Sequence, residues 1–385
     1  MEYTQGVRFD SLNLSPEIMR AIAQRGIEVS TPVQAGCIPP MMDWQDVIAK
    51  APTGTGKTFA YGIPIVEHVD PEDESVQAVI LAPTRELAIQ ITDEIRDLAA
   101  FKPGVRTVCL YGGAPIGRQI DTLKKHPQIV VATPGRLSDH MKRRTVRVDT
   151  AQTVVLDEAD RMLDMGFVRD VTRILDQIKH RRNLGMFSAT ISREVMDIAW
   201  VYQRDAAEVT VREDEQNKPD IKQFRMEVAQ NEKATAIARI LNETGFDRCM
   251  AFCNTKGSTE RITKFLQMEG IDAQCIHGDI PQKRREQVMD LFRQGKLRVF
   301  VSTDVAARGI DVDDVDIVFN CDVPDENQDY IHRIGRTGRA KRQGVAVTFV
   351  SDYPAKMRID DIAQKTRNEI TPVKFGPDGK LTTVE

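Results

Sequence analysis

The sequence predicts an α/β protein made of two domains, each built on a parallel β-sheet and joined by a flexible linker. From Val47 onward, apolar runs rich in Val, Ile and Leu alternate with segments of helical periodicity, which is typical of doubly wound sheets. The alternation stops in the charged stretch 212–222 and then resumes. A chain of 385 residues is long enough for each half to bury its own core.

These observations divide the chain into four parts. Residues 1–211 form the predicted first domain, 212–222 the linker, 223–367 the second domain and 368–385 a short, turn-rich tail. The linker assignment rests on the sequence REDEQNKPD at 212–220, which is charged, poor in apolar residues and contains a proline.

Composition narrows the class of protein. The chain is 41% hydrophobic and 29% charged with a net charge of −4, so it is not a basic protein that binds nucleic acid over its whole surface. A nucleic-acid site would have to be a local groove. The start of the chain lacks the features of a secretory signal, and no run of 18 apolar residues occurs. We therefore expect a cytoplasmic protein without a membrane span.

Cysteine spacing favours free thiols over a metal site. The six cysteines include no C-x-x-C pair, and five of them lie in or beside apolar runs that predict strands. Buried thiols in a reducing compartment are the preferred interpretation.

The region 9–34 predicts a helix with a defined start and stop. Ser15, Pro16 and Glu17 supply an N-cap, a first-turn proline and an acidic residue, and Gly26 supplies the stop. Residues 31–34 (TPVQ), taken alone, predict only a turn.

Seven strands are predicted in the first domain, and several of them end in polar residues. Their ranges are 47–51, 78–82, 107–111, 129–132, 153–156, 184–187 and 207–211. Ligands of parallel sheets bind beyond the carboxyl ends of the strands. Residues 83–87 (PTREL), 112–113 (GG), 133–136 (TPGR), 157–160 (DEAD) and 188–190 (SAT) follow predicted strands, which indicates one functional edge.

The first strand leads into a predicted phosphate-binding loop, Ala51 to Thr58 (APTGTGKT). It matches the pattern G-x-x-x-x-G-K-[ST] except that Ala51 occupies the first glycine position. Backbone N–H groups around Thr53, Gly54, Thr55 and Gly56 can surround an anion at a helix N-terminus. Lys57 is placed to reach the β- and γ-phosphates of a nucleotide, and the Thr58 hydroxyl to bind Mg²⁺.

An acidic pair completes the chemistry that this loop lacks. Asp157 and Glu158 follow the apolar run Val154–Leu156. Asp157 can hold Mg²⁺ directly or through water, and Glu158 can orient or deprotonate an attacking water.

The second domain repeats the layout without a phosphate loop of its own. Its predicted strands are 223–228, 249–253, 273–276, 298–302, 315–320 and 345–350, and helical spacing occupies segments such as 257–269 and 281–294.

With these motifs in order from Phe9 to about Val350, the chain resembles the DEAD-box family of superfamily 2 RNA helicases. The resemblance implies two RecA-like domains, ATP as substrate and Mg²⁺ as cofactor. Phe9 and residues 31–34 resemble the family's adenine-recognition motif. The second half adds 252–255 (FCNT), 282–285 (QKRR), 302–304 (STD), 307–311 (ARGID) and 332–339 (HRIGRTGR). Pro52 and Ile27 depart from the family pattern, which has Gln and commonly an aromatic residue there.

Roles for individual residues follow from the resemblance. A glutamine amide both donates and accepts, so Gln34 can pair with the N6–N7 edge of adenine and favour ATP over GTP. Asp311 is implied to touch the ribose. Arg336 and Arg339 would reach the phosphates as arginine fingers only when the second domain closes on the first. Contacts that couple the two domains are implied for Asp160, Ser188, Thr190, Arg308 and His332, with Asp160 bonded to the 188–190 segment.

The expected RNA contacts are mostly small, glycine-rich or hydroxylated, with a few arginines, which suits a grip on sugar and phosphate and not on base edges. They are Pro83, Arg85, Gly113, Thr133, Gly135, Arg136, Gln282, Arg285 and Thr303. The additional basic runs 142–144 and 179–182 are interpreted first as solvated faces.

The sequence thus predicts an ATP-dependent RNA helicase that acts on single-stranded RNA or short duplexes as a monomer. RNA would stimulate ATP hydrolysis, coupled to local, non-processive strand separation or to remodelling of RNA–protein complexes with protein partners. Two alternatives remain open. The protein could be an ATP-gated RNA clamp whose slow hydrolysis serves release, or a P-loop ATPase that acts on protein or DNA.

Overall fold

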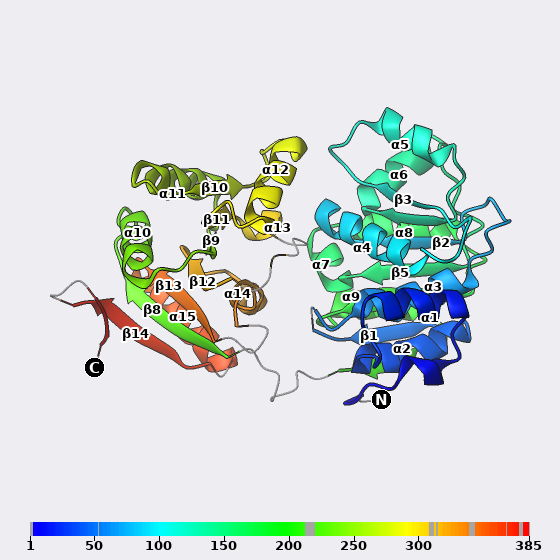
Figure 1. Cartoon of the computed structure of the whole chain (residues 1–385), viewed down its shortest axis with the longest axis horizontal. Coiled ribbons are helices and arrows are strands. Elements are labelled where there is room, and N and C mark those ends of the chain that lie inside the picture. Colours follow the sequence, from blue (N-terminus) through cyan, green and yellow to red (C-terminus); the bar gives the residue numbers. More distant parts are fainter. Residues whose placement is uncertain are drawn as a thin grey trace. The chain divides into compact units, whose positions relative to one another are not determined.

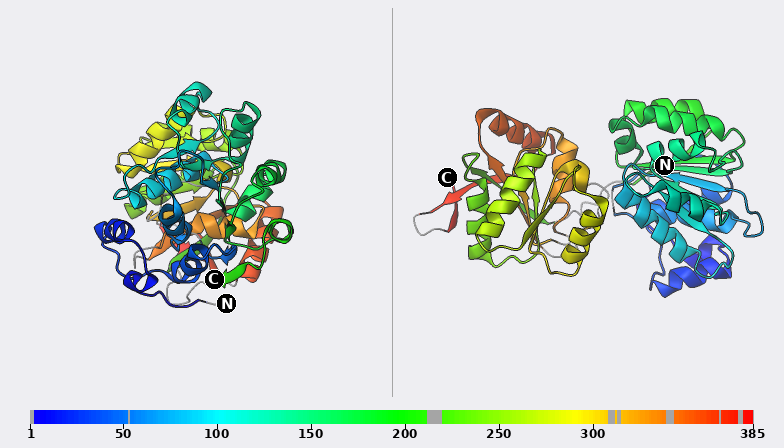
Figure 2. Two further views of the ribbon diagram at one scale, coloured as in Figure 1. Left: turned by 90° about the vertical axis from the view of Figure 1, so that its right-hand side faces the viewer. Right: turned by 90° about the horizontal axis from the view of Figure 1, so that it is seen from above.

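The computed structural model describes residues 3–52, 54–211, 220–307, 312, 315–338, 343–366, 368–376 and 380–384. The chain divides into two compact units, Met1–Asn217 and Lys218–Glu385. Each unit is an α/β domain with a central sheet and helices on both faces (Figures 1 and 2). Most of the predicted linker, residues 212–219, lies outside the described residues, and Ile221 already belongs to a strand.

The sheet of the first unit is parallel throughout and has the order β3-β4-β2-β5-β6-β1-β7. Its strands lie where the apolar runs predict them: β1 Val47–Lys50, β2 Ala78–Leu81, β3 Thr107–Leu110, β4 Ile129–Ala132, β5 Thr153–Asp157, β6 Asn183–Ser188 and β7 Ala207–Thr210. The nearly continuous apolar composition of these strands follows from burial of both sheet faces.

Two sets of helices cover these faces. One core packs against η1 Phe9–Leu12, α1 Pro16–Gln24, α2 Pro32–Met42, α3 Lys57–His68 and α4 Arg85–Leu98. The other packs against α5 Ile116–Leu123, α6 Pro134–Lys142, α7 Ala159–Asp164, α8 Val168–Gln177 and α9 Arg193–Tyr202. Several of these helices begin at side-chain caps: Ser15, Thr31, Thr84 and Ser192 each accept a bond from a backbone N–H of the first turn.

The second unit has an eight-stranded sheet in the order β10-β11-β9-β12-β13-β8-β14-β15. Its strands are β8 Ile221–Glu227, β9 Cys249–Phe252, β10 Ala273–Ile276, β11 Val299–Ser302, β12 Ile317–Asn320, β13 Gly344–Val350, β14 Ile370–Phe375 and β15 Leu381–Thr383. Helices α10 Lys233–Thr244 and α11 Lys256–Met268 cover one face. Helices α12 Gln282–Arg293, α13 Asp304–Ala307, α14 Asn327–Ile334 and α15 Tyr353–Thr366 cover the other (Figure 1).

The structure corrects the predicted tail. Residues 370–375 and 381–383 are not a turn-rich extension but strands that enlarge the second sheet. β14 pairs in parallel with β8, β15 pairs antiparallel with β14, and Val373 is buried in the core. Gly376 and Pro377 made this segment look like a turn, whereas pairing with a distant strand determines its structure.

The helix predicted within 9–34 is confirmed with its start and stop: α1 is Pro16–Gln24, capped by Ser15, and it ends before Gly26 at φ +69°. Only the end of this region needs correction. Residues 31–34 are not merely a turn but the capped start of α2. Pro39 and Pro40 lie inside α2, and because such prolines normally indicate a loop, a helix is not predicted there.

Within the described part of the chain, no helix is long and apolar enough to cross a lipid bilayer.

Candidate active site

The phosphate loop connects the end of β1 to the start of α3, as the sequence predicts. Gly54 and Gly56 adopt φ of +80° and +86°, a left-handed conformation that favours glycine. A Cβ on Gly56 would lie 2.4 Å from Gln34 Nε2, so this position also needs glycine for space. Thr53, assigned to the same loop, lies outside the described residues.

Lys57 and Ala51 face each other across this loop. The Lys57 side chain is buried, and its Nζ donates to the Ala51 carbonyl at 3.1 Å. Ala51 is itself fully buried, and its N–H donates to the Ser188 carbonyl at 2.9 Å. The methyl group of alanine is therefore accommodated where the motif has glycine. An ammonium has three donors, so the bond to Ala51 leaves capacity for phosphate oxygens.

Gln34 joins the start of α2 to the phosphate loop. Its Oε1 accepts from the Thr31 N–H at 2.9 Å, which completes a capping box, and its Nε2 donates to the Gly56 carbonyl at 3.1 Å. A primary amide has two donors and two acceptor sites, and one of each is engaged in this way. The remaining capacity is what recognition of an adenine edge would use.

The Phe9 side chain supports this region from within the first unit. It is 1% exposed and packs in the core of the first unit. The ring therefore helps to place the segment around it, and its contact with the nucleotide stays a prediction. Ile27, in contrast, is an exposed apolar side chain on the same N-terminal segment.

Asp157 ends β5 and is almost completely buried. Its Oδ1 accepts from the Glu158 N–H at 2.9 Å, and its Oδ2 accepts from the Tyr61 hydroxyl at 2.8 Å. Burial raises the pKa of Asp157 to about 6, although the nearby Lys57 ammonium acts in the opposite direction. The charge of Lys57 therefore partly offsets the effect of burial on the pKa of Asp157.

Glu158 follows in a left-handed backbone conformation at φ +48°, which is uncommon for a residue with a side chain. Its Oε2 accepts from Arg161 Nη1 at 2.7 Å, and both side chains are only 10% exposed. Arg161 thus holds the carboxylate that the sequence assigns to activation of water. Arg161 is not among the residues predicted from the sequence, although its i,i+3 spacing from Glu158 at the start of α7 could have indicated the pair.

Asp160 links the acidic segment to the end of β6. Its Oδ2 accepts from the Thr190 hydroxyl at 2.6 Å and the Thr190 N–H at 2.9 Å, and its own N–H donates to Ser188 Oγ at 3.1 Å. Burial alone would raise the pKa of Asp160, but these hydrogen bonds outweigh it and lower the pKa. The bond implied between Asp160 and the 188–190 segment is therefore present.

The donor atoms near the loop fit Mg²⁺ bound together with a nucleotide. Thr58 and Asp157 supply oxygen donors, which Mg²⁺ prefers. Among the described residues, no cluster of three or more His, Cys, Asp or Glu could hold a metal by itself. That pattern suits an ion held by one carboxylate, a hydroxyl, water and substrate phosphates, and the cysteines are free thiols.

The first sheet separates two groups of motifs. The phosphate loop, the acidic segment and residues 188–190 follow β1, β5 and β6, which lie together in the sheet order. The segments predicted to touch RNA follow β2, β3 and β4 on the other side of β5. Parallel strands place both groups at the same edge of one sheet.

Within the second group, the arginines already have protein contacts. Gly113 has φ +86°, and a Cβ there would lie 2.3 Å from Arg85 Nη1, so the Arg85 guanidinium covers this glycine. Arg136 Nη1 donates to the Ala114 carbonyl and to Gln119 Oε1, each at 3.1 Å. Pro83 and Thr133 are buried at their strand ends, and Gly135 is exposed in the first turn of α6.

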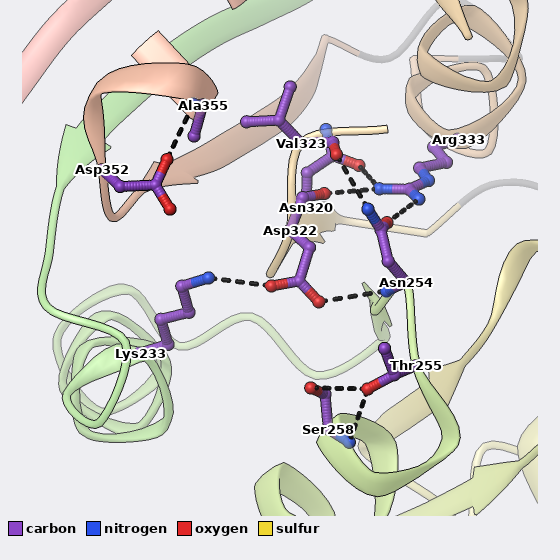
Figure 3. Close-up of polar contacts among 10 residues, drawn as sticks. All are labelled: Lys233, Asn254, Thr255, Ser258, Asn320, Asp322, Val323, Arg333, Asp352 and Ala355. Atoms are coloured by element: carbon purple, nitrogen blue, oxygen red, sulfur yellow. Dashed lines mark hydrogen bonds and ion pairs between the residues drawn. The ribbon is translucent and has the colours of Figure 1, made fainter. Parts of the chain in front are cut away.

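In the second unit, a buried arginine connects several motifs (Figure 3). Arg333 is 1% exposed and forms a two-pronged ion pair with Asp304, with Nε–Oδ1 and Nη2–Oδ2 distances of 2.6 and 2.5 Å. Figure 3 shows its guanidinium directed at Asn254, whose Oδ1 it reaches at 2.9 Å. The Asp322 carboxylate lies between the Asn254 N–H and the Lys233 ammonium. Arg333 is therefore a structural anchor of α14.

The other predicted residues of this unit follow its strand ends. Gln282 begins α12, Thr303 follows β11, and His332 and Arg336 lie at the end of α14 and just beyond it. Arg285 Nη2 donates to the Ala306 carbonyl at 3.3 Å. Arg308, Asp311 and Arg339 lie outside the described residues.

Comparison with known proteins gives matches over both units. A family model described as DEAD/DEAH box helicase matches residues 31–198, and one described as helicase conserved C-terminal domain matches residues 232–341. The chain is 44% identical over 343 residues to the DEAD-box ATP-dependent RNA helicase CshA of Geobacillus kaustophilus, which covers 89% of this chain and 73% of the relative. It is 41% identical over 368 residues to CshA of Bacillus subtilis, covering 96% and 74%.

Solved structures are similar over nearly the same length. S. cerevisiae Dbp5 bound to RNA and ADP BeF3 matches with a TM-score of 0.84 and 30% identity, covering 95% of each chain. A DEAD box protein from the hyperthermophile Methanococcus jannaschii matches with a TM-score of 0.54 and 39% identity, covering 95% of this chain and 99% of that chain.

Proposed function

Because the chain belongs to the DEAD-box family of ATP-dependent RNA helicases, we propose that it uses RNA-stimulated ATP hydrolysis to separate short RNA duplexes or remodel RNA–protein complexes. The arrangement that carries this proposal lies at one edge of the first sheet. There the phosphate loop, which carries Lys57, lies beside the acidic segment with Asp157 and Glu158. The acidic segment is in turn bound to the residues after β6 through the Asp160–Thr190 contact.

Each residue of this edge has a proposed task in hydrolysis. Lys57 neutralises the β- and γ-phosphates, and Gln34 selects adenine with the remaining capacity of its amide. Glu158 orients the attacking water and accepts its proton. Thr58 and Asp157 would hold Mg²⁺, which when bound supplies positive charge to the phosphate oxygens.

Full activity is proposed to require residues of both units. Arg336 and Arg339 would stabilise the charge that develops on the γ-phosphate, Asp311 would contact the ribose, and Arg308 and His332 would couple the units. Arginine fingers contribute roughly 10³–10⁵ in rate, so their arrival would make hydrolysis depend on the two units meeting on RNA.

RNA is proposed to bind through sugar and phosphate, since the residues assigned to it are small, hydroxylated or basic. These residues are Pro83, Arg85, Gly113, Thr133, Gly135, Arg136, Gln282, Arg285 and Thr303. Contacts to 2′-hydroxyl groups would explain a preference for RNA over DNA. We propose that the protein acts as a cytoplasmic monomer and that protein partners direct it to particular RNAs.

Steady-state ATP hydrolysis without nucleic acid, with single-stranded RNA and with DNA of matching sequence tests this proposal. We expect stimulation by RNA and little by DNA. The Glu158→Gln variant should retain ATP binding but lose at least roughly 10²-fold in RNA-stimulated turnover, because glutamine cannot accept the proton of water. Wild-type turnover in this variant would refute the role of Glu158, and hydrolysis indifferent to RNA would refute the coupling.

Duplex unwinding distinguishes a helicase from an ATP-gated clamp that uses the same site. A helicase releases labelled strands from a short RNA duplex in an ATP-dependent manner. A clamp would bind the RNA tightly with ATP and release few strands.

A further inference from the structure

A buried tyrosine that none of the motifs assigns lies against the metal-holding side of the nucleotide site. Tyr61 is 0% exposed and lies on α3 one helical turn after Lys57, so both side chains project from the same face of the helix. Its hydroxyl donates to Asp157 Oδ2 at 2.8 Å, across 96 residues of sequence. Its ring packs edge-on against Phe187 of β6, with centroids 5.0 Å apart.

This phenol determines how the Asp157 carboxylate is oriented. Oδ1 accepts from the Glu158 backbone N–H, and Oδ2 accepts from Tyr61, so donors from two separate elements fix the plane of the carboxylate. Thr58, the other residue assigned to Mg²⁺, lies on α3 three positions before Tyr61. Tyr61 therefore ties the Asp157 carboxylate to α3, the helix that also carries Thr58.

We propose that Tyr61 is a positioning residue that orients Asp157 relative to Thr58 for the Mg²⁺ that accompanies the nucleotide. The inference rests on the proposed nucleotide site. Hydrogen-bond partners of metal-binding side chains typically influence metal affinity by roughly 10–100-fold. Phenylalanine would preserve the ring packing against Phe187 but leave a buried carboxylate oxygen without its donor, which is costly and favours a different side-chain orientation.

The test is a Tyr61→Phe variant of the full chain, probed with a fluorescent N-methylanthraniloyl derivative of ADP. Its affinity is measured in EDTA and at increasing MgCl₂, without RNA, so that no catalysis contributes. We expect the half-saturating Mg²⁺ concentration to rise roughly tenfold. The affinity in EDTA should stay within about twofold of the wild type, because the phosphate loop itself is unchanged.

Tyr330→Phe is the matched control. Tyr330 is also 0% exposed, and its hydroxyl donates to Gln223 Oε1 at 3.0 Å in the second unit. The Tyr330→Phe variant loses a comparable buried hydrogen bond, so its thermal stability should fall by a similar amount. The Mg²⁺ dependence of its ADP binding should stay that of the wild type.

Three results would overturn the inference. If Tyr61→Phe shows the Mg²⁺ dependence of the wild type, the phenol serves packing only. If it loses affinity equally in EDTA, the phenol supports the whole pocket and has no specific role toward the metal. If the wild-type protein itself shows no Mg²⁺-dependent ADP binding, the proposed nucleotide site fails, and the inference fails with it.

Discussion

At the scale of single residues, Trp44 shows how side-chain contacts hold an unfavourable backbone conformation. Trp44 has φ +63°, which is unusual for a bulky residue. Its ring stacks on His68 with centroids 3.8 Å apart, and the Arg182 guanidinium lies 3.6 Å from the centre of the Trp44 ring. His68 also bonds the Met42 carbonyl through Nε2 at 3.1 Å. This stack makes the first unit sensitive to the charge of His68.

We predict that protonation of His68 destabilises the first unit. Burial lowers the pKa of His68 from 6.5, and the neighbouring Arg182 acts in the same direction. Below pH 6.5 the unfolded chain then binds more protons at this site than the folded chain, so the stability that neutral His68 provides above pH 6.5 is lost as pH falls. Thermal unfolding of the wild type and of His68→Phe between pH 7.5 and pH 5.5 measures this effect.

The phenylalanine variant keeps a ring on Trp44 but cannot take up a proton. The difference in unfolding free energy between wild type and variant should therefore shrink as pH falls. A difference that is constant over this range would show that His68 does not titrate differently in the folded and unfolded chain.

At the scale of elements, the turn after β3 depends on one glycine. Gly113 has φ +86°, and because it has no side chain, the guanidinium of Arg85, the first residue of α4, can lie directly against it. An alanine there would be strained by its backbone conformation and would displace the guanidinium. The proposed contact of the Arg85 guanidinium with RNA thus depends on the absence of a side chain at Gly113.

Gly113→Ala should weaken RNA binding and leave ATP binding intact. The displaced Arg85 guanidinium loses a hydrogen bond between charged groups, worth about 1.5–3 kcal/mol, which predicts a loss of roughly tenfold or more in affinity for single-stranded RNA. Fluorescence anisotropy with labelled RNA and a non-hydrolysable ATP analogue measures it. Gly117→Ala is the control, because its Cβ would meet nothing within 4 Å, and its affinity should change by less than about twofold. Equal effects of the two substitutions would contradict the role of Gly113.

At the scale of the whole molecule, the two units have separate cores and sheets, so each is expected to unfold as a cooperative unit. The second unit contains an ion pair between Arg333 and Asp304, whose side chains are 1% and 20% exposed. Asp304 compensates the charge of Arg333, which lies on α14 and also contacts Asn320 at the end of β12 and Asn254 in the loop after β9.

Asp304→Asn should destabilise the second unit alone. It leaves the Arg333 charge buried without its counter-ion, a change that typically costs about 3–5 kcal/mol. Asp279→Asn removes an exposed pair with Lys256, whose side chains are 68% and 53% exposed, and should cost less than about 1 kcal/mol. Calorimetry resolves the expected shift of one unfolding transition. A similar effect of both substitutions, or a shift of the transition of the first unit, would contradict this assignment.

Features that a short run of neighbouring residues encodes could be predicted from the sequence: the strands, the phosphate loop, the acidic segment and the ends of α1. Apolar runs bounded by polar residues placed the strands from β1 to β13, and the phosphate loop and acidic segment could be found because a few consecutive residues carry the chemistry. Their positions at one sheet edge follow from parallel order alone. Ser15 and Gly26 likewise fixed the ends of α1, because caps and stops act within one helical turn.

Which side chains meet across the sheet follows from the three-dimensional fold alone. Tyr61 bonds Asp157, which lies 96 residues away in the sequence, and Gln34 bonds Gly56 of the phosphate loop, 22 residues away. Arg333 looks like its basic neighbours in the sequence but is buried, because Asp304 at the start of α13 and Asn254 in the loop after β9 converge on it. Residues 370–375 form strand β14 because they pair with the edge of the distant strand β8. Such contacts depend on distance in space, which a pattern of neighbouring residues does not encode.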